Sequence, residues 1–140
     1  MELHESARKL IGKGADATLV TLNPDGSPHV SLVWVAWRST PDGDELVAAH
    51  LSANRKVRNI RRDPRVAVTI VSPSGPERPF STWLSINGTG RIVEGGAPEL
   101  LKELSETMTP GVEFVTEGAS PGFRTRIHID TVGGVGPWAT

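Results

Sequence analysis

Residues 46–70 read LVAAHLSANRKVRNIRRDPRVAVTI, and this stretch decides how the chain is organised. Apolar segments at its two ends predict strands, and the basic segment between them begins after a polar turn. Val57 and Ile60 lie three residues apart, which predicts a helix with one apolar face over residues 54–62. Pro64 disfavours helical backbone at the residue before it, so the helix is expected to end there. The stretch therefore predicts strand, helix and strand in that order.

The start of this predicted helix carries Ser52, Asn54, Arg55 and Lys56. The first N–H groups of a helix have no intrahelical partner and lie at the positive end of its dipole, so the position suits a phosphate or another anion. An ordinary surface helix with Asn54 as its N-cap and a solvated basic face explains the same residues. For this stretch taken alone, the ordinary helix is the favoured interpretation. No aromatic residue is interleaved with the basic ones, which argues against nucleic-acid binding.

Composition excludes several classes of function. The 140 residues carry 15 Lys and Arg against 16 Asp and Glu, a formal charge of -1 that argues against nucleic acid and membrane surfaces as partners. The absence of cysteine rules out disulfides, thiolate metal sites and a cysteine nucleophile. There is no apolar run of transmembrane length and no secretory leader at the N-terminus, so a cytoplasmic protein is expected.

The remaining chain predicts a mainly β fold in a single domain over residues 1–140. Strands are expected over residues 17–22, 29–37, 45–50, 65–71, 80–94 and 124–131, and helices over 4–12, 54–62 and 97–108. Segments 72–76 and 109–122 are expected to be loops, and the fifth strand to bend at Gly88 and Gly90. Six mostly antiparallel strands in so short a chain need to close to protect their edges, which predicts a small β-barrel with helices covering its gaps.

The tryptophans and histidines offer further candidates. Trp34 and Trp37 lie three positions apart in one predicted strand, so they face opposite ways and one of them lies outside the barrel core. His50 ends the strand that leads to the basic helix, where it either hydrogen-bonds a ligand or faces water. The four histidines lack metal-ligand spacing, so no metal site is expected.

Three motifs carry a resemblance to a known family. These are the turn Asn-Pro-Asp-Gly-Ser-Pro-His-Val over residues 23–30, the spacing Lys56-x-x-Asn59-Ile60-x-x-Asp63-Pro64, and Gly-Gly-Val-Gly-Pro-Trp over 133–138. With this order of strands, the chain resembles the pyridoxamine 5'-phosphate oxidase-like flavoproteins, whose fold is the FMN-binding split β-barrel. It is most similar to the actinobacterial branch that uses the deazaflavin coenzyme F-420. The resemblance covers about residues 5–138.

The resemblance implies a homodimer with two cofactors in clefts between the subunits. It implies that the cofactor phosphate lies at Lys56, with help from Arg55, Asn54, Ser52 and Asn59. It implies that the ring lies near Val33, Trp34, Val35 and His50, with Trp83 as a further candidate wall. The acidic tail of coenzyme F-420 would need a basic cleft mouth, for which Arg58, Arg61, Arg62, Arg124 and Arg126 are candidates on charge alone.

The activity that the resemblance implies is hydride transfer from reduced F-420 to a C=C or C=N bond of a small conjugated molecule. The alternatives are an FMN-dependent oxidoreductase, a protein that binds or stores a flavin, deazaflavin or haem without turnover, and a plain dimeric scaffold. The C-terminal region lacks the Arg-x-x-Arg signature of the vitamin B6 oxidases, which argues against that activity. No side chain is singled out as catalytic, because the cofactor supplies the chemistry and solvent can supply a proton.

Overall fold

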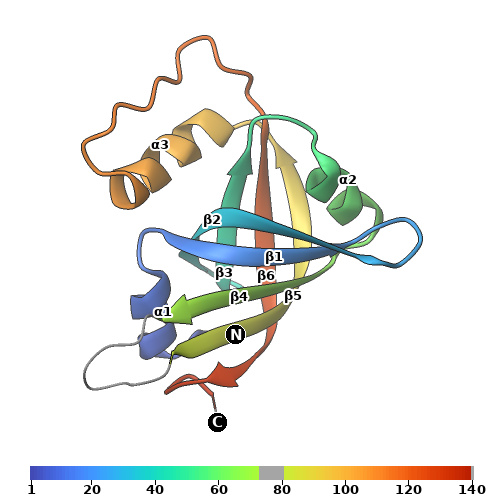
Figure 1. Cartoon of the computed structure of the whole chain (residues 1–140), viewed down its shortest axis with the longest axis vertical. Helices are drawn as coiled ribbons and strands as arrows, with labels where there is room; N and C mark the ends of the chain where they lie inside the picture. The colour runs from blue at the N-terminus through green and yellow to red at the C-terminus, as the bar shows by residue number, and fades with distance from the viewer. Residues whose placement is uncertain (73–80, 140) are drawn as a thin grey trace.

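Six antiparallel strands form a closed barrel in the computed structural model, which describes residues 1–72 and 81–139 (Figure 1). Along the chain the elements are α1 (Glu5–Ile11), β1 (Ala15–Leu22), β2 (Pro28–Thr40), β3 (Gly43–His50), α2 (Arg55–Arg62), β4 (Arg65–Ser72), β5 (Thr82–Glu94), α3 (Ala97–Met108) and β6 (Phe123–Val135). Around the barrel the strand order is β1-β2-β3-β6-β5-β4, and β4 pairs with β1 to close it. The predicted mainly β, six-stranded split barrel is therefore confirmed.

Five of the six strands are longer than the sequence pattern predicts, and β2 and β6 differ most from the predicted ranges. Ser39 and Thr40, read as a turn, continue β2 because they pair with Asp44 and Gly43 of β3. β6 runs past the expected end at residue 131 to Val135, since its glycines pair with β5 although they break the polar–apolar alternation. Most of the expected loop over 72–76 and the first residue of the predicted strand 80–94 lie outside the described residues.

The barrel is split between β2 and β3. Residues 28–35 of β2 pair with β1, and only the last five residues of the strand, from Ala36 onward, pair with β3. β3 continues beyond Val47 along β6 alone. In Figure 1, β1 and β2 accordingly run across the view while β3 and β6 run along it. The described chain thus leaves the strand edge before Ala36 and the last residues of β3 without a strand partner on the facing side.

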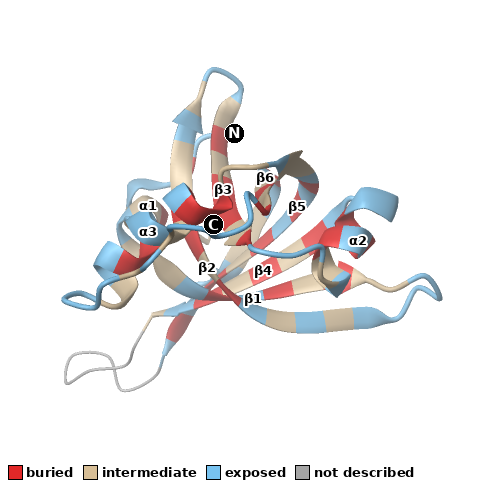
Figure 2. Cartoon of the chain, turned by 90° about the horizontal axis from the view of Figure 1, so that it is seen from above, coloured by how far each residue is buried: buried red, intermediate tan, exposed pale blue. Residues whose placement is uncertain are grey.

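The three helices each cover a different part of the barrel. α1 and α2 contribute Ala7, Ile11 and Ile60 to the same buried cluster as the barrel interior. α3 lies outside the barrel and packs Leu100 and Leu104 against β2 and β3. Figure 2 shows the buried residues inside the strands and on the inner sides of the helices. Each buried aliphatic side chain contributes about 1.5–3 kcal/mol, so the core fixes the position of the helix starts.

The two tryptophans of β2 face opposite ways, as their spacing predicts. Trp37 packs against the barrel core, and the guanidinium of Arg8 lies over its ring at 4.7 Å from the centroid. Trp34 packs outside the barrel in the cluster beneath α3. It is therefore Trp34 that is available to the surface beside the split.

Candidate functional site

The N-terminus of α2 is capped by its own sequence. The Asn54 side chain accepts a hydrogen bond from the N–H of Val57 at 3.2 Å, as an N-cap does. Val57 and Ile60 are buried, which directs that side of the helix toward the barrel. The ordinary-helix interpretation was therefore right about Asn54 as the cap. It leaves open what the cationic residues after the cap contact.

A cavity of about 360 Å³ lies at the split, next to this helix start. Five of the residues predicted for a cofactor site line it: Val33, Trp34, His50, Asn54 and Lys56. The other five lining residues were not predicted from the sequence: Asp16, Leu32, Ala49, Leu51 and Leu101. Leu32 could have been found, because it lies two residues from Trp34 on the same face of β2. Leu101 could not, since it was assigned only to the apolar stripe of its helix.

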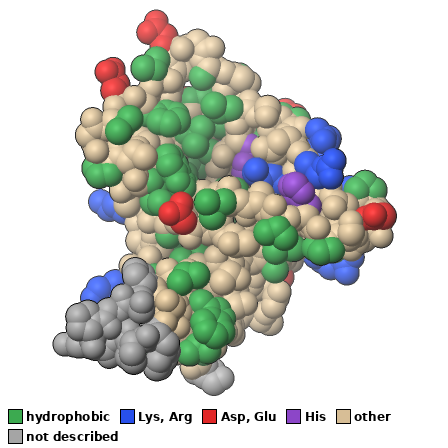
Figure 3. All heavy atoms as spheres, viewed as in Figure 1, with side chains coloured by type: hydrophobic (Ala, Val, Ile, Leu, Met, Phe, Trp, Pro, Cys, Tyr) green, Lys and Arg blue, Asp and Glu red, His purple; other side chains and the backbone are tan. Residues whose placement is uncertain are grey.

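The cavity has an apolar wall and a polar end. Trp34, Leu32 and Leu101 form the wall, and the α2 end carries Asn54 and Lys56. In the space-filling view, hydrophobic side chains cover the surface toward α3, while histidine and basic side chains gather beside α2 (Figure 3). The unpartnered edge of β2 adds backbone N–H and C=O groups. This combination suits a flat, partly apolar ligand that carries an anionic group at one end.

Lys56 is the cation of this cavity. Its side chain is half-buried, and burial lowers the pKa of its ammonium group. Within the described residues no carboxylate lies within ion-pair distance of it. Asp16 also lines the cavity, without pairing with Lys56. An anion that entered the cavity would therefore meet an ammonium group that is partly removed from water and has no ion-pair partner among the described residues.

His50 is buried rather than facing water, so that alternative was wrong. Only 4% of the residue is exposed, and its Nε2 lies 2.7 Å from the hydroxyl oxygen of Thr125 on β6. Burial lowers the pKa of His50 to about 4, and the positive charge of Lys56 acts in the same direction. The imidazole is therefore neutral at pH 7. The strand pairing causes this burial, because His50 shares the inward face of β3 with Leu46 and Ala48.

The other predicted site residues lie elsewhere. Ser52 is exposed in the turn before α2 and does not line the cavity. Val35 is fully buried in the barrel core, one pleat beyond Val33. Trp83, on β5, is 41% exposed, and its backbone carbonyl accepts a hydrogen bond from the indole of Trp138. The structure therefore does not bring these three side chains to the cavity within one chain.

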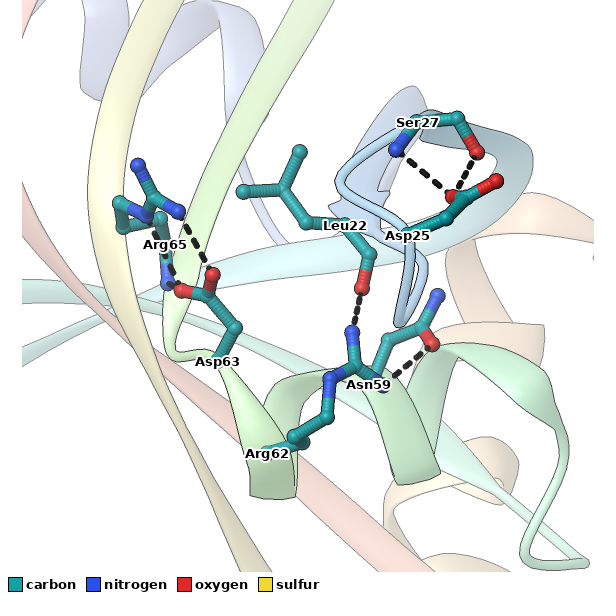
Figure 4. A network of polar contacts seen from close by, with 7 residues as sticks. All are labelled: Leu22, Asp25, Ser27, Asn59, Arg62, Asp63 and Arg65. Carbon is teal, nitrogen blue, oxygen red and sulfur yellow. Dashed lines mark hydrogen bonds and ion pairs between the residues drawn. The ribbon is translucent and has the colours of Figure 1, made fainter.

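Asn59 attaches α2 to the barrel. It is 2% exposed and donates hydrogen bonds to the Thr21 hydroxyl at 3.0 Å and to the Asn23 side-chain carbonyl at 3.1 Å. Its own side-chain carbonyl accepts a hydrogen bond from Arg62, which also donates to the carbonyl of Leu22 (Figure 4). These contacts hold α2 to the end of β1, which places Lys56 at the cavity.

A second groove, of about 630 Å³, lies between α2 and the turn that joins β1 to β2. Arg55, Arg58 and Arg62 line it, together with one carboxylate, Asp25, which accepts hydrogen bonds from Ser27. Within the described residues these arginines form no ion pair. Arg65, by contrast, donates two hydrogen bonds to the carboxylate of Asp63 (Figure 4). This pairing lowers the pKa of the Asp63 carboxyl group to about 2. The groove is thus a basic surface next to the cavity, on the other side of the helix start.

The remaining candidate arginines lie apart from this groove. Arg61 pairs with Glu94 at 3.4 Å, and Arg126 pairs with Glu45 at 2.9 Å. Arg124 donates to the carbonyl of Gly95. The five arginines proposed for one cleft mouth are therefore distributed over at least two surfaces.

The described residues contain no group of His, Cys, Asp or Glu side chains that could hold a metal ion. None of the helices in this part of the chain is both long enough and apolar enough to span a bilayer.

The chain is similar in sequence to one protein family and in fold to several solved structures. The family model described as pyridoxamine 5'-phosphate oxidase matches residues 3–130. An F420 reductase shares 21% identity at a TM-score of 0.72, over 90% of this chain and 94% of that one. A conserved hypothetical protein from Mycobacterium tuberculosis shares 22% identity at a TM-score of 0.70, over 94% of this chain and 84% of that one. The haem storage protein of Vibrio cholerae shares 14% identity at a TM-score of 0.60, over 96% of this chain and 95% of that one. At these identities the structures show a common fold, and no curated protein matches the sequence.

Proposed function

The chain belongs to the pyridoxamine 5'-phosphate oxidase family, and from that premise we propose that it is an oxidoreductase that binds the deazaflavin coenzyme F-420. The observation that carries the proposal is the cavity at the split, where an apolar wall, a strand edge and Lys56, which has no ion-pair partner among the described residues, lie together. An FMN-dependent reaction is the alternative on the same cavity. The F420 reductase has the same fold as this chain, which supports the choice of cofactor.

The residues present fit such a cofactor. Lys56 would hold the phosphate, since its ammonium has no acidic partner among the described side chains. Trp34 and Leu101 offer a flat apolar wall to a ring, and the unpartnered edge of β2 offers backbone hydrogen bonds to its polar side. When bound and reduced, the cofactor supplies a hydride to an electron-poor C=C or C=N bond of a small conjugated substrate. The side chains orient the reactants and exclude water, and none is assigned as catalytic.

The basic groove is proposed to hold the acidic part of the cofactor. Arg55, Arg58 and Arg62 line it and form no ion pair in the described structure, so the three cations outnumber the single carboxylate of the groove, Asp25. Arg55 directly precedes Lys56, so an anionic chain that leaves the cavity at the helix start reaches this groove next. Arg124 and Arg126 lie on another surface and are not part of this proposal.

A second copy of the chain is proposed to complete the site. The outer face of β1, β2, β4 and β5 carries Val30, Leu32, Val71 and Trp83, which are 41–68% exposed. Strand pairing brings these side chains onto one face, since Val20 is opposite Val30 and Val71 is opposite Trp83. Leu32 belongs both to this face and to the cavity wall, so the cavity opens onto the face. We therefore propose a homodimer with the cofactor at its interface.

Titration of the purified protein with F-420, FMN and haem tests the function. We expect F-420 to bind most tightly, and Lys56→Ala to weaken its binding by about 10–100-fold, the value of one charge-assisted hydrogen bond of about 1.5–3 kcal/mol. Lys13→Ala is the matched control, because Lys13 is exposed and does not line the cavity. Equal affinity of the Lys56 variant and the wild type would contradict the phosphate position. A yellow protein as purified that prefers FMN would favour the alternative.

A further inference from the structure

His50 and Thr125 form an isolated hydrogen-bonded pair at the polar end of the cavity. The distance from Nε2 to the Thr125 hydroxyl oxygen is 2.7 Å, and Thr125 is fully buried. The pair joins the last residue of β3 to β6, where the two strands still pair although β2 has already separated from β3. The orientation of the imidazole is therefore fixed by the barrel and not by a mobile loop.

The second nitrogen of the ring, Nδ1, is not used by the Thr125 contact. Nδ1 has no hydrogen-bond partner among the described residues. Among the described residues, the side-chain polar atoms that are both buried and without a hydrogen-bond partner are Ser31 Oγ and Thr82 Oγ1. Nδ1 is not one of them although it lacks a partner, so it is accessible to solvent. Since His50 is almost completely buried and lines the cavity, that access is through the cavity. Nδ1 is thus a hydrogen-bonding atom that the protein leaves for a ligand.

The role of Nδ1 depends on Thr125. A neutral imidazole has one N–H donor and one acceptor nitrogen, and a hydroxyl can either donate or accept. If Thr125 donates to Nε2, Nδ1 carries the hydrogen and donates into the cavity; if Nε2 donates to Thr125, Nδ1 accepts. Asp16 and Lys56 are the ionisable neighbours that line the cavity with His50. The pair can therefore present either a donor or an acceptor without acquiring charge.

We propose that His50, positioned by Thr125, is the contact that allows the cavity to hold a redox-active ring in both its oxidised and its reduced form. This inference rests on the proposed function. The reduced ring would carry one hydride and one ring-nitrogen proton more than the oxidised ring, so that nitrogen would be a donor in the reduced form and an acceptor in the oxidised form. If the reduced ring gave its hydride to the C=C or C=N bond of the substrate, a C–H bond would form there, and the ring-nitrogen proton would pass to the substrate or to water. His50 meets the two forms with opposite tautomers, and Thr125 rotates its hydroxyl to match.

Nitrogen-15 NMR of the histidine rings tests the first part. Spectra are recorded for the protein alone, with oxidised F-420 and with reduced F-420, and the His50 signals are assigned by their absence in His50→Asn. We expect a neutral ring from pH 6 to 8 in all three samples, and a different protonated nitrogen in the oxidised and reduced complexes. A charged ring at neutral pH, or the same tautomer in both complexes, would overturn the proposal.

Affinities for the two redox forms test the role of Thr125. Thr125→Val removes the hydroxyl at nearly constant volume, and Thr125→Ser retains it. We expect the valine variant to change the ratio of the two dissociation constants by about tenfold, which is a shift of about 30 mV for a two-electron couple. The serine variant should keep the wild-type ratio. A purely structural role would weaken both forms equally.

The outcomes separate this inference from the proposed function. Wild-type protein that binds neither F-420 nor FMN would overturn both. Wild-type binding with the same affinity ratio in Thr125→Val would overturn only the inference. Thermal unfolding of the valine and serine variants shows whether each one folds. If the valine variant does not fold, the tautomers of the wild type and the ratio in Thr125→Ser still decide the question.

Discussion

His50 is the residue whose ionisation should be visible in stability. Its pKa is about 4 in the folded chain, below the ordinary value of 6.5. Between these values the unfolded chain binds more protons than the folded one, so stability should fall as the pH falls from about 6.5 to 4. We expect a loss on the order of 2–3 kcal/mol over this range for the wild type and a much smaller loss in His50→Asn. Urea unfolding at pH 7 and pH 4.5 measures both.

This pH range distinguishes His50 from Asp25 and Asp63, the carboxyl groups whose pKa values are lowered by hydrogen bonds. Asp63 has a folded pKa of about 2 because Arg65 pairs with it, so its contribution is present above its ordinary pKa of 3.8 and is lost below that pH. Both Asp63 and the other three histidines remain in the His50→Asn variant. Parallel stability curves for wild type and variant would show that His50 is not desolvated in the folded state.

Gly88 in β5 lies where the neighbouring strand leaves no room for a side chain. The pairing with β6 shifts register between Asn87 and Gly88, and a Cβ at Gly88 would lie 2.4 Å from the His128 carbonyl oxygen. Because that oxygen belongs to the backbone of the neighbouring strand, the ladder itself would have to move. We expect Gly88→Ala to lower the free energy of unfolding by about 1–3 kcal/mol, as overpacking does. Chemical denaturation measures the change.

Gly133, on the neighbouring strand, supplies the control for this prediction. A Cβ at Gly133 meets nothing within 4 Å, and the backbone there is ordinary extended chain. Gly133→Ala should be neutral or slightly stabilising, since alanine loses less backbone entropy on folding. Equal destabilisation by the two substitutions would mean that any side chain in this ladder is unfavourable, and that the close approach at Gly88 is not the cause.

Elements whose ends are determined by nearby residues were predicted well from the sequence. The bounds of α2 were predicted to within one residue, because the capping Asn54, the apolar pair and Pro64 all lie inside one short segment. The ends of β2 and β6 were missed, since Thr40 and Val135 are held by partners on other strands. The bend expected in the fifth strand at Gly88 coincides with the register shift found there.

The site required more than the pattern of one strand. Val33 and Val35 share a face of β2, yet only Val33 lines the cavity, because β3 has already separated from β2 at that level. Lys56 was identified from its place at a helix start. The burial of His50 was not, because the sequence does not state that β6 brings Thr125 beside it. Site residues that are close in sequence, such as Asn54 and Lys56, were predicted together. Contacts between distant strands of the closed barrel, such as the one between His50 and Thr125, were not predicted.

The proposed dimer can be tested on the whole molecule with Val71→Arg. Val71 is 59% exposed beside Trp83 and does not line the cavity, so an arginine there adds charge to the outer face without entering the binding site. We expect light scattering to give twice the chain mass of 15.0 kDa for the wild type and the single mass for the variant, which should also bind F-420 at least tenfold more weakly. Val115→Arg, at a valine that is 73% exposed between α3 and β6, should remain dimeric. A monomeric variant with wild-type affinity would show that one chain forms the complete site, and a monomeric wild type would refute the dimer.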